Sequence, residues 1–241
     1  MQDPISAPPK PISEIWRPEL TCLPRLTAIR RFARRFFRGL LRLVLLCSAR
    51  VIVRGLENYP RQGPALVVMN HLGDVDALVM LAYLPVLPEM LAKIELHEIP
   101  VLGPLMDAYG VIWIHRGTAD RRALKAALEG LRIGRFVGVS PEGRESLTGG
   151  LEEATNGAIF LATRADVPVV PVTLTGTANS LIYGNLRRFR RSEISLTVGK
   201  PFRLPGIKHR REAMQEGTRI IMESLARQLP AEYRGVYGYV E

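Results

Sequence analysis

The stretch that decides the predicted fold is Ala65-Leu-Val-Val-Met-Asn-His-Leu-Gly-Asp-Val-Asp76. Its first five residues form a short apolar run, which is typical of a buried strand in a parallel sheet. Polar residues follow immediately, and residues 77–84 then have the apolar pattern of a helix. The stretch therefore predicts a strand that passes directly into a helix, and open α/β sheets bind ligands at that edge.

His71 and Asp76 stand at the junction of this predicted strand and helix. A carboxylate can hold one imidazole nitrogen protonated and leave the other nitrogen as a base, so the pair is a candidate general-base dyad. An Asp five positions after a His arises by chance in about one chain in ten of this composition, so the spacing alone is weak evidence. The alternative is a structural His at a strand end, followed by an Asp that caps a helix.

Two further predicted strands also end in chemically capable side chains. The strand at residues 111–114 leads to Arg116, and the strand at residues 136–139 leads to a polar segment that contains Glu142. The carboxyl ends of parallel strands meet at one edge of a sheet. We therefore expect His71, Arg116 and Glu142 to converge on one site, which is stronger evidence than any single motif.

Other apolar runs complete the predicted α/β architecture. Further strands are predicted at residues 51–53, 90–96, 167–172 and 194–198. Further helices are predicted within residues 119–131, 149–165 and 208–229. The strand at 167–172 carries Pro168 and Pro171, which favours an edge strand or a bulge near a site. Strands that alternate with helices predict a mixed, largely parallel sheet flanked by helices.

The composition bounds the class of protein. The chain has 241 residues, 47% of them hydrophobic, which is enough for a substantial core in one large domain with or without an appendage. Its two cysteines, Cys22 and Cys47, suggest neither a disulfide framework nor a zinc site and favour a reducing compartment. Acidic residues near His71 are few and arginines crowd them, so we predict no metal site.

The charge of the chain is strongly basic and unevenly spread. The formal net charge is +10, and residues 1–60 hold eleven basic side chains against four acidic ones. Most of the basic residues are arginines, whose fork geometry suits phosphate groups. This excess indicates an anionic partner, either nucleic acid or a membrane surface.

The N-terminal region is predicted to contain two parts before a main domain at residues 50–241. Residues 1–11 are rich in proline and have little to bury, which predicts a disordered tail, and they lack the pattern of a signal peptide. Residues 12–49 form a basic amphipathic motif with a helix from about residue 25. Its apolar residues at helical spacing are Leu26, Ile29, Phe32, Phe36, Phe37, Leu40 and Leu41. Its arginines on much of the other face are Arg30, Arg31, Arg34, Arg35, Arg38 and Arg42.

This helix has the character of one that lies in a membrane interface. Its longest uncharged run, residues 43–49, is far shorter than the ~20 residues that a membrane span needs. The alternative is an amphipathic helix packed on its own domain. Nucleic acid is a poorer choice, because the arginines alternate with a broad apolar face and no nucleic-acid module accompanies them. We therefore predict an anionic membrane surface, and no nucleic acid, as partner.

Four blocks in this order resemble those of the glycerolipid acyltransferases, the family of 1-acylglycerol-3-phosphate acyltransferases. The blocks are Asn70-His71-x4-Asp76, Gly110-Val-Ile-Trp-Ile-His-Arg116, Pro141-Glu-Gly-Arg-Glu-Ser146 and Val167-Pro-Val-Val-Pro171. The resemblance runs from about residue 51 to residue 202, and the order and spacing of the blocks make it specific.

The resemblance implies acyl transfer from acyl-CoA or acyl carrier protein to the free sn-2 hydroxyl of lysophosphatidic acid, giving phosphatidic acid. It implies His71 as the general base and Asp76 as the group that orients it. Expected substrate-binding residues are Arg116, Glu142, Gly143, Arg144 and Pro171, with the acceptor phosphate on Arg116 or Arg144. No cofactor is expected beyond the acyl donor. The helical motif is expected to dock on the cytoplasmic face of the cell membrane, as in a peripheral or monotopic protein.

The chain departs from the family pattern at three blocks. Gly73 stands where the first block usually has Ser, and His115 stands where the second usually has Asp. In the third block Ser140 replaces Phe, and Arg144-Glu145 replaces Thr-Arg, which moves the guanidinium one position earlier. These departures leave open which arginine holds the phosphate and which acceptor is used.

Several roles also stay open. Glu142 either binds the glycerol hydroxyl or braces a neighbouring arginine, and Pro171 either lines an acyl channel or is plain core. The arginines at 187–191, which surround Phe189, bind lipid headgroups or donor phosphates, or form a solvated turn. Alternatives to the main function are another acceptor, such as glycerol 3-phosphate or another lysophospholipid, and a non-catalytic lipid-binding relative. A lipid hydrolase would need Ser140 or Ser146 as nucleophile.

Overall fold

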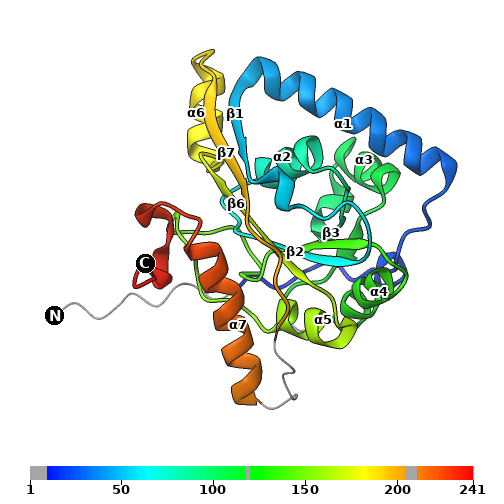
Figure 1. Cartoon of the computed structure of the whole chain (residues 1–241). Coiled ribbons are helices and arrows are strands. Elements are labelled where there is room, and N and C mark those ends of the chain that lie inside the picture. Colours follow the sequence, from blue (N-terminus) through cyan, green and yellow to red (C-terminus); the bar gives the residue numbers. More distant parts are fainter. Residues whose placement is uncertain (1–9, 118–119, 205–210, 241) are drawn as a thin grey trace.

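The computed structural model describes residues 10–117, 120–204 and 211–240. A seven-stranded sheet lies between two layers of helices (Figure 1). The strands are β1 (Ala49–Arg54), β2 (Ala65–Met69), β3 (Glu89–Lys93), β4 (Ile112–Ile114), β5 (Phe136–Val139), β6 (Val169–Thr175) and β7 (Ser192–Val198). The helices are α1 (Ala28–Ser48), α2 (Val75–Tyr83), α3 (Leu102–Tyr109), α4 (Arg121–Arg132), α5 (Gly157–Ala165), α6 (Asn179–Arg187) and α7 (Arg211–Ala226).

The strands follow the order β1-β7-β6-β2-β5-β3-β4 across the sheet. All neighbouring strands run parallel except β6 and β7, which are antiparallel. The predicted mixed, largely parallel sheet flanked by helices is therefore confirmed. Because β2 pairs with both β5 and β6, the residues that follow it emerge near the middle of the sheet edge.

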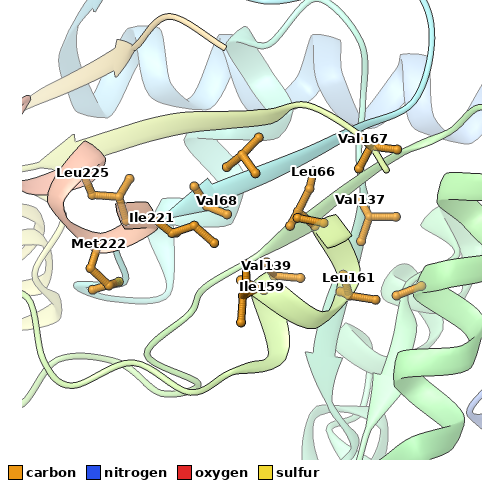
Figure 2. Close-up of a cluster of buried hydrophobic side chains, with 14 of the residues drawn as sticks. Leu66, Val68, Val137, Val139, Ile159, Leu161, Val167, Ile221, Met222 and Leu225 are labelled. Atoms are coloured by element: carbon orange, nitrogen blue, oxygen red, sulfur yellow. The ribbon is translucent and has the colours of Figure 1, made fainter. Parts of the chain in front are cut away.

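Both faces of β2 are buried, which explains its unbroken apolar run. Leu66 and Val68 belong to a cluster that includes side chains of α4, α5 and α7, part of which Figure 2 shows. Ala65, Val67 and Met69 belong to a second cluster with side chains of α1, α2 and α6. Alternate residues of one strand thus hold the two layers of helices on opposite faces of the sheet.

The prolines of β6 do not mark an edge strand, so that one of the two expected explanations is wrong. β6 pairs with β2 on one side and with β7 on the other. The carbonyl of Pro171 accepts a hydrogen bond from Gly199, just beyond the end of β7. The ladder between β6 and β7 begins at Val172, so the missing N–H of Pro171 interrupts no pairing. The predicted strand at 90–96 is also shorter, because β3 ends at Lys93.

α6 is a helix that the sequence pattern does not predict. Its nine residues mix polar, aromatic and small side chains, and only Ile182 among them is buried. A helix with so little buried apolar surface has weak periodicity, so the pattern of this segment indicates only a loop and a charged patch.

Four of the six arginines of α1 donate hydrogen bonds to the domain, whereas Arg31 and Arg35 are exposed. Arg38 and Arg42 donate to backbone carbonyls at the C-terminal end of α2, and Arg30 donates to a carbonyl near the end of α3. Arg34 is 6% exposed and pairs with the buried carboxylate of Glu89 at 3.1 and 2.5 Å. Carbonyls at helix ends lack partners within their own helix, so these arginines satisfy groups that would otherwise be unpaired.

Leu45 of α1 is buried, and Phe37 and Leu41 pack partly against the domain, but many apolar side chains of the helix face outward. Those that stay exposed are Ile29, Phe32, Phe36, Leu40, Leu43, Val44 and Leu46. The helix begins at Ala28, where the Thr27 side chain accepts a hydrogen bond from the backbone of Arg30. Within the described residues, no helix has the length and apolarity needed to cross a bilayer. The predicted tail at 1–11 falls outside the described residues except for Lys10 and Pro11.

Candidate active site

His71 and Asp76 form a hydrogen-bonded pair just beyond the end of β2. His71 Nδ1 lies 2.9 Å from Asp76 Oδ2, and the carboxylate is fully buried in the first turn of α2. The same Oδ2 accepts the backbone N–H groups of Leu72, at 2.6 Å, and Gly73, at 2.9 Å. Three donors therefore hold the carboxylate in one place, and the carboxylate fixes the ring of His71.

The second ring nitrogen of His71 is available for chemistry. Its side chain is 26% exposed, and within the described chain Nε2 has no hydrogen-bond partner. Burial works against protonation, but the hydrogen bond and charge of Asp76, with the charges of Glu145 and Glu142, outweigh it and raise the pKa of His71. Once neutral, an imidazole with a raised pKa is a stronger base.

Glu142 braces the backbone at the site. Its Oε1 accepts the backbone N–H of His71 at 3.1 Å, and its Oε2 accepts that of Glu152 at 3.1 Å. The side chain is only 1% exposed, and this burial raises the pKa of Glu142 to about 7. The carboxylate thus joins the end of β5 to the backbone of His71. Gly143 follows in the positive-φ conformation (φ +71°) that a glycine adopts readily.

Arg144 is engaged in an internal ion pair. Its Nε lies 2.8 Å and its Nη2 2.7 Å from Glu152 Oε2, and both side chains are less than 10% exposed. The other carboxylate oxygen of Glu152 accepts the backbone N–H of Leu147 at 2.6 Å. This arrangement stiffens the loop after β5. The main contact of the Arg144 guanidinium is therefore with Glu152, in the same loop.

Arg116 is more accessible than Arg144. Its side chain is 24% exposed, and its Nη2 lies 3.7 Å from Glu95 Oε2. Its backbone is fixed by Ser13, whose hydroxyl accepts the N–H of Arg116 and whose own N–H donates to the Arg116 carbonyl. The N-terminal segment therefore runs beside the end of β4 and holds Arg116 in place.

Lys93, which lies in no sequence block, and Glu145, which the third block contains only as a departure from the family pattern, join the site. Lys93 ends β3, the strand beside β4, and its Nζ lies 4.0 Å from Glu145 Oε1. Glu145 also accepts a hydrogen bond from Asn179 at 3.0 Å. The signal for Lys93 was the same one that identified Arg116, a basic residue at the end of an apolar run. Pro171 is buried in the sheet and shares no hydrogen bond with these residues in the described chain.

Close packing around position 73 explains why this residue is a glycine. A Cβ at this position would lie 2.5 Å from Asn179 Oδ1 and 2.6 Å from the carbonyl oxygen of Thr177. The segment before α6 approaches the loop after β2 so closely that a Ser at 73 does not fit this arrangement. The departure from the family pattern is therefore matched by a close contact with Asn179.

The two nearby serines are not aligned as nucleophiles. Ser146 donates its hydroxyl to the Gly150 carbonyl and accepts the Gly149 N–H, while Ser140 Oγ is buried without a partner in the described chain. Neither hydroxyl is hydrogen-bonded to His71. The described residues also contain no group of three or more His, Cys, Asp or Glu side chains able to hold a metal ion.

Comparison with known proteins identifies the family. The model of the family described as Acyltransferase matches residues 50–175, which is more than half of the chain and includes the dyad. The chain belongs to the acyltransferase family. The resemblance seen in the four sequence blocks is thereby confirmed, and the matched region of this acyltransferase covers β1 through β6.

Curated relatives and one solved structure agree with this assignment. The 1-acyl-sn-glycerol-3-phosphate acyltransferase alpha of Bos taurus is 30% identical over 206 residues, covering 84% of this chain and 71% of that protein. The 1-acyl-sn-glycerol-3-phosphate acyltransferase of Borreliella burgdorferi is 30% identical over 57% of this chain and 56% of its own length. A chloroplastic relative from Brassica napus is 32% identical over 62% of this chain and 44% of its own length. The chain thus spans about half the length of these last two relatives.

The crystal structure of the 1-acyl-sn-glycerophosphate acyltransferase of Thermotoga maritima has a similar fold. The TM-score is 0.62 and the sequences are 24% identical, over 81% of this chain and 80% of the other. At this level of identity the likeness concerns the fold. The sheet and its flanking helices are therefore those of a known acyltransferase structure.

Proposed function

We propose that this acyltransferase transfers an acyl chain from acyl-CoA or acyl carrier protein to the sn-2 hydroxyl of lysophosphatidic acid, giving phosphatidic acid. The observation that carries the proposal is the pairing of His71 Nδ1 with the buried carboxylate of Asp76, which leaves Nε2 available. The names of the relatives support the same acceptor.

In the proposed reaction His71 acts as the general base. The lipid hydroxyl attacks the thioester carbon as Nε2 takes its proton, the C–S bond breaks, and the thiolate leaves with the proton that His71 returns. Positioned general-base help is worth roughly 10²–10⁴ in rate. Asp76 holds Nδ1 protonated and stabilises the imidazolium that forms. Thiolate is a good leaving group, so the reaction needs no covalent acyl-enzyme.

The acceptor phosphate is proposed to bind at Arg116, with Lys93 at the neighbouring strand end. Both cations are partly exposed, whereas Arg144 is mostly buried against Glu152. Charge-assisted hydrogen bonds from a guanidinium suit a phosphate dianion. Arg144 then contributes by shaping the loop that carries Glu142, and it is a weaker candidate for direct contact.

The protein is proposed to work at an anionic membrane surface on the cytoplasmic side. α1 presents a row of exposed apolar side chains, including Phe32 at 69% and Leu46 at 66%, on the face away from the domain. A helix that lies in an interface buries such a face among the lipid headgroups and upper acyl chains. Three of the six arginines of α1 are exposed as well (Arg31, Arg35 and Arg42), so charge and apolar burial are both proposed to contribute to this binding.

The experiment that tests the function measures thiol release from acyl-CoA in the presence of lysophosphatidic acid. His71→Ala is expected to lower kcat by roughly 10²–10⁴, and His97→Ala, which removes a histidine on η3 (Ile94–Glu98), serves as the matched control. An active His71→Ala protein would remove the proposal. Glycerol 3-phosphate, a lysophospholipid with a larger headgroup and acyl carrier protein as donor are compared in the same assay.

A further inference from the structure

Phe189 is the most exposed large apolar side chain in the described chain. It is 98% exposed and sits in the turn between α6 and β7. Its backbone has a φ of +53°, a conformation that glycine adopts readily and that bulky side chains disfavour. Neither packing nor backbone geometry therefore explains an aromatic residue at this position.

The turn that presents Phe189 is well defined. The N–H of Phe189 donates to the carbonyl of Leu186 at 3.1 Å, and the N–H of Arg190 donates to the carbonyl of Asn185 at 2.9 Å. Asn185 also donates through its side chain to the hydroxyl of Ser192 at 3.1 Å, where β7 begins. The aromatic ring is thus held out from the protein by a hydrogen-bonded reversal of the chain.

Phe189 is surrounded by arginines that the fold does not use. Arg187, Arg188 and Arg190 are exposed, and within the described residues none of them forms an ion pair. Arg191 differs, because it donates to the backbone carbonyl of Ala49 at the start of β1. We refer to residues 187–190 as the Arg–Phe tip.

The Arg–Phe tip lies beside the end of α1. The contact of Arg191 with Ala49 fixes this neighbourhood, and Figure 1 shows the turn between α6 and β7 next to the junction of α1 and β1. Leu43 and Leu46, in the last turns of α1, are 58% and 66% exposed. An exposed aromatic ring among arginines therefore continues the exposed apolar face of a neighbouring helix.

We propose that the Arg–Phe tip is a second membrane contact, in which Phe189 enters the interface of an anionic bilayer while the three arginines bind lipid phosphates. Aromatic rings settle at the headgroup level, and basic residues near an anionic surface each strengthen binding. Arginine also matches phosphate geometry. The tip continues the exposed apolar face of α1. This favours a membrane as the partner, because the phosphate backbone of a nucleic acid would not bury that apolar face.

α6 connects this contact to the catalytic loop. At its start Asn179 accepts the backbone N–H of Asp74 at 2.9 Å and donates to Glu145 at 3.0 Å. One turn later the hydroxyl of Tyr183 donates to the carboxylate of Asp74 at 2.9 Å. If the proposed acyl transfer holds, the tip therefore sets how the active-site edge meets the lipid surface.

The binding test uses the full chain and vesicles of phosphatidylcholine and phosphatidylglycerol. Replacing Arg187, Arg188 and Arg190 together by Ala is expected to lower the partition constant about a hundredfold, and Phe189→Ala several-fold. Matched controls are Ile133→Ala and a triple Ala replacement of Arg121, Lys125 and Arg132. These exposed residues of α4 and its C-terminal cap lie beside the other face of the sheet.

One further variant and one further ligand separate the proposal from a structural role. Phe189→Gly relieves the positive φ, so its stability is expected to match or exceed that of the parent while its vesicle binding falls. Unchanged vesicle binding by Phe189→Gly and the triple arginine variant would overturn the proposal. Loss of binding to a single-stranded oligonucleotide, with vesicle binding intact, would overturn it in favour of nucleic acid.

An activity measurement tests the link to the site. Phe189→Ala is expected to acylate a monomeric short-chain lysophosphatidate at the parent rate and to lose most of its rate on long-chain substrate in vesicles. Equal loss on both substrates would contradict a membrane role for the tip. If the parent chain transfers no acyl group, the proposed function fails, while the vesicle measurement still decides the role of the Arg–Phe tip.

Discussion

The chain contains two His-x4-Asp pairs, and their comparison shows what makes one of them a candidate catalyst. His115 and Asp120 repeat the spacing of His71 and Asp76, and both motifs have a glycine two positions after the histidine. In both pairs Nδ1 contacts the Asp Oδ2, at 2.9 Å for His71 and 3.0 Å for His115. The local geometry of the two pairs is therefore nearly the same.

The two pairs differ in what happens to the second ring nitrogen. Nε2 of His115 accepts the backbone N–H of Arg17 at 3.0 Å, and the ring is covered by Trp16 with 4.6 Å between centroids. His115 is 4% exposed, whereas His71 lies at the surface of the site with Nε2 available. A carboxylate orients an imidazole in either case, but only an accessible second nitrogen can take a proton from a substrate.

Asp120 also has a structural task. Its Oδ1 accepts the N–H groups of Arg122 and Ala123 at the start of α4. Burial raises its pKa, but these hydrogen bonds and those from His115 outweigh burial and lower the pKa of Asp120. The second pair thus anchors the N-terminal segment and caps α4. This is the structural alternative considered above for His-x4-Asp, a histidine at a strand end followed by an aspartate that caps a helix.

The largest expected effect separates the two carboxylates. Asp76→Asn is expected to lower kcat by roughly 10²–10⁴, because the amide no longer stabilises the imidazolium of His71. Asp120→Asn is the matched control and is expected to keep kcat within a few-fold. Steady-state kinetics of both variants decide the comparison, and equal losses of kcat would show that the two pairs cannot be told apart by access to Nε2.

A positioning effect of intermediate size is expected at Glu142. The amide of Glu142→Gln has one acceptor oxygen for two backbone N–H groups, so the backbone of His71 loses part of its support. We expect kcat to fall roughly tenfold with a smaller change in KM. A change in KM alone would instead indicate that Glu142 contacts the substrate.

The pH dependence of the rate sharpens the assignment of His71. Catalysis needs the neutral ring, so kcat/KM is expected to rise as pH increases through the raised pKa of His71. Asp76→Asn removes the hydrogen-bonded charge that raises this pKa, and the acid limb is expected to move to lower pH in its residual activity. Asp120→Asn should leave the limb in place, and a matching shift in that variant would contradict the assignment.

The same pKa shift has a defined sign for stability. The folded-state pKa of His71 is raised, so its pairing with Asp76 stabilises the fold fully below the unfolded pKa of about 6.5. This contribution is lost as pH rises through the folded-state pKa. The free energy of unfolding of His71→Ala, measured by denaturant titration, is therefore expected to differ most from that of the parent at low pH.

The smallest effect on catalysis is expected at His115. His115→Ala removes the acceptor of the Arg17 N–H and opens a cavity under Trp16, so we expect a loss of about 2 kcal/mol in the free energy of unfolding. The rate per folded molecule should change little, because the ring faces the N-terminal segment. A rate loss comparable to that of His71→Ala would break the comparison.

The sequence predicted much of the fold because its signals are local. The apolar run before His71, the strand ends at Arg116 and Glu142 and the amphipathic pattern of α1 each follow from periodicity within a short window. The sequence missed α6, whose only buried side chain is Ile182, and the prolines of β6 suggested an edge strand or a bulge where the strand in fact has neighbours on both sides. Both errors came from segments whose packing partners are distant in the chain.

Three features of the site became visible only in the folded structure. The sequence left open whether Arg116 or Arg144 holds the acceptor phosphate, and only the fold shows Arg144 buried against Glu152. Gly73 departs from the family pattern for a reason that only the fold supplies, because Asn179 lies 2.5 Å from the point that a Cβ at position 73 would occupy. Lys93 was overlooked because the predicted strand continued past it to residue 96, which hid its place at a strand end.

By itself, the sequence determined the α/β class, the dyad at His71 and Asp76 and the existence of an amphipathic N-terminal helix. Spacing and periodicity fix which residues share a strand end or a helix face. Only the tertiary structure decided that Arg34 of α1 is buried against Glu89 and that the backbone N–H of Arg17, 98 residues away, occupies Nε2 of His115. Burial and hydrogen bonding between distant segments decide which chemically capable side chains stay open to a substrate.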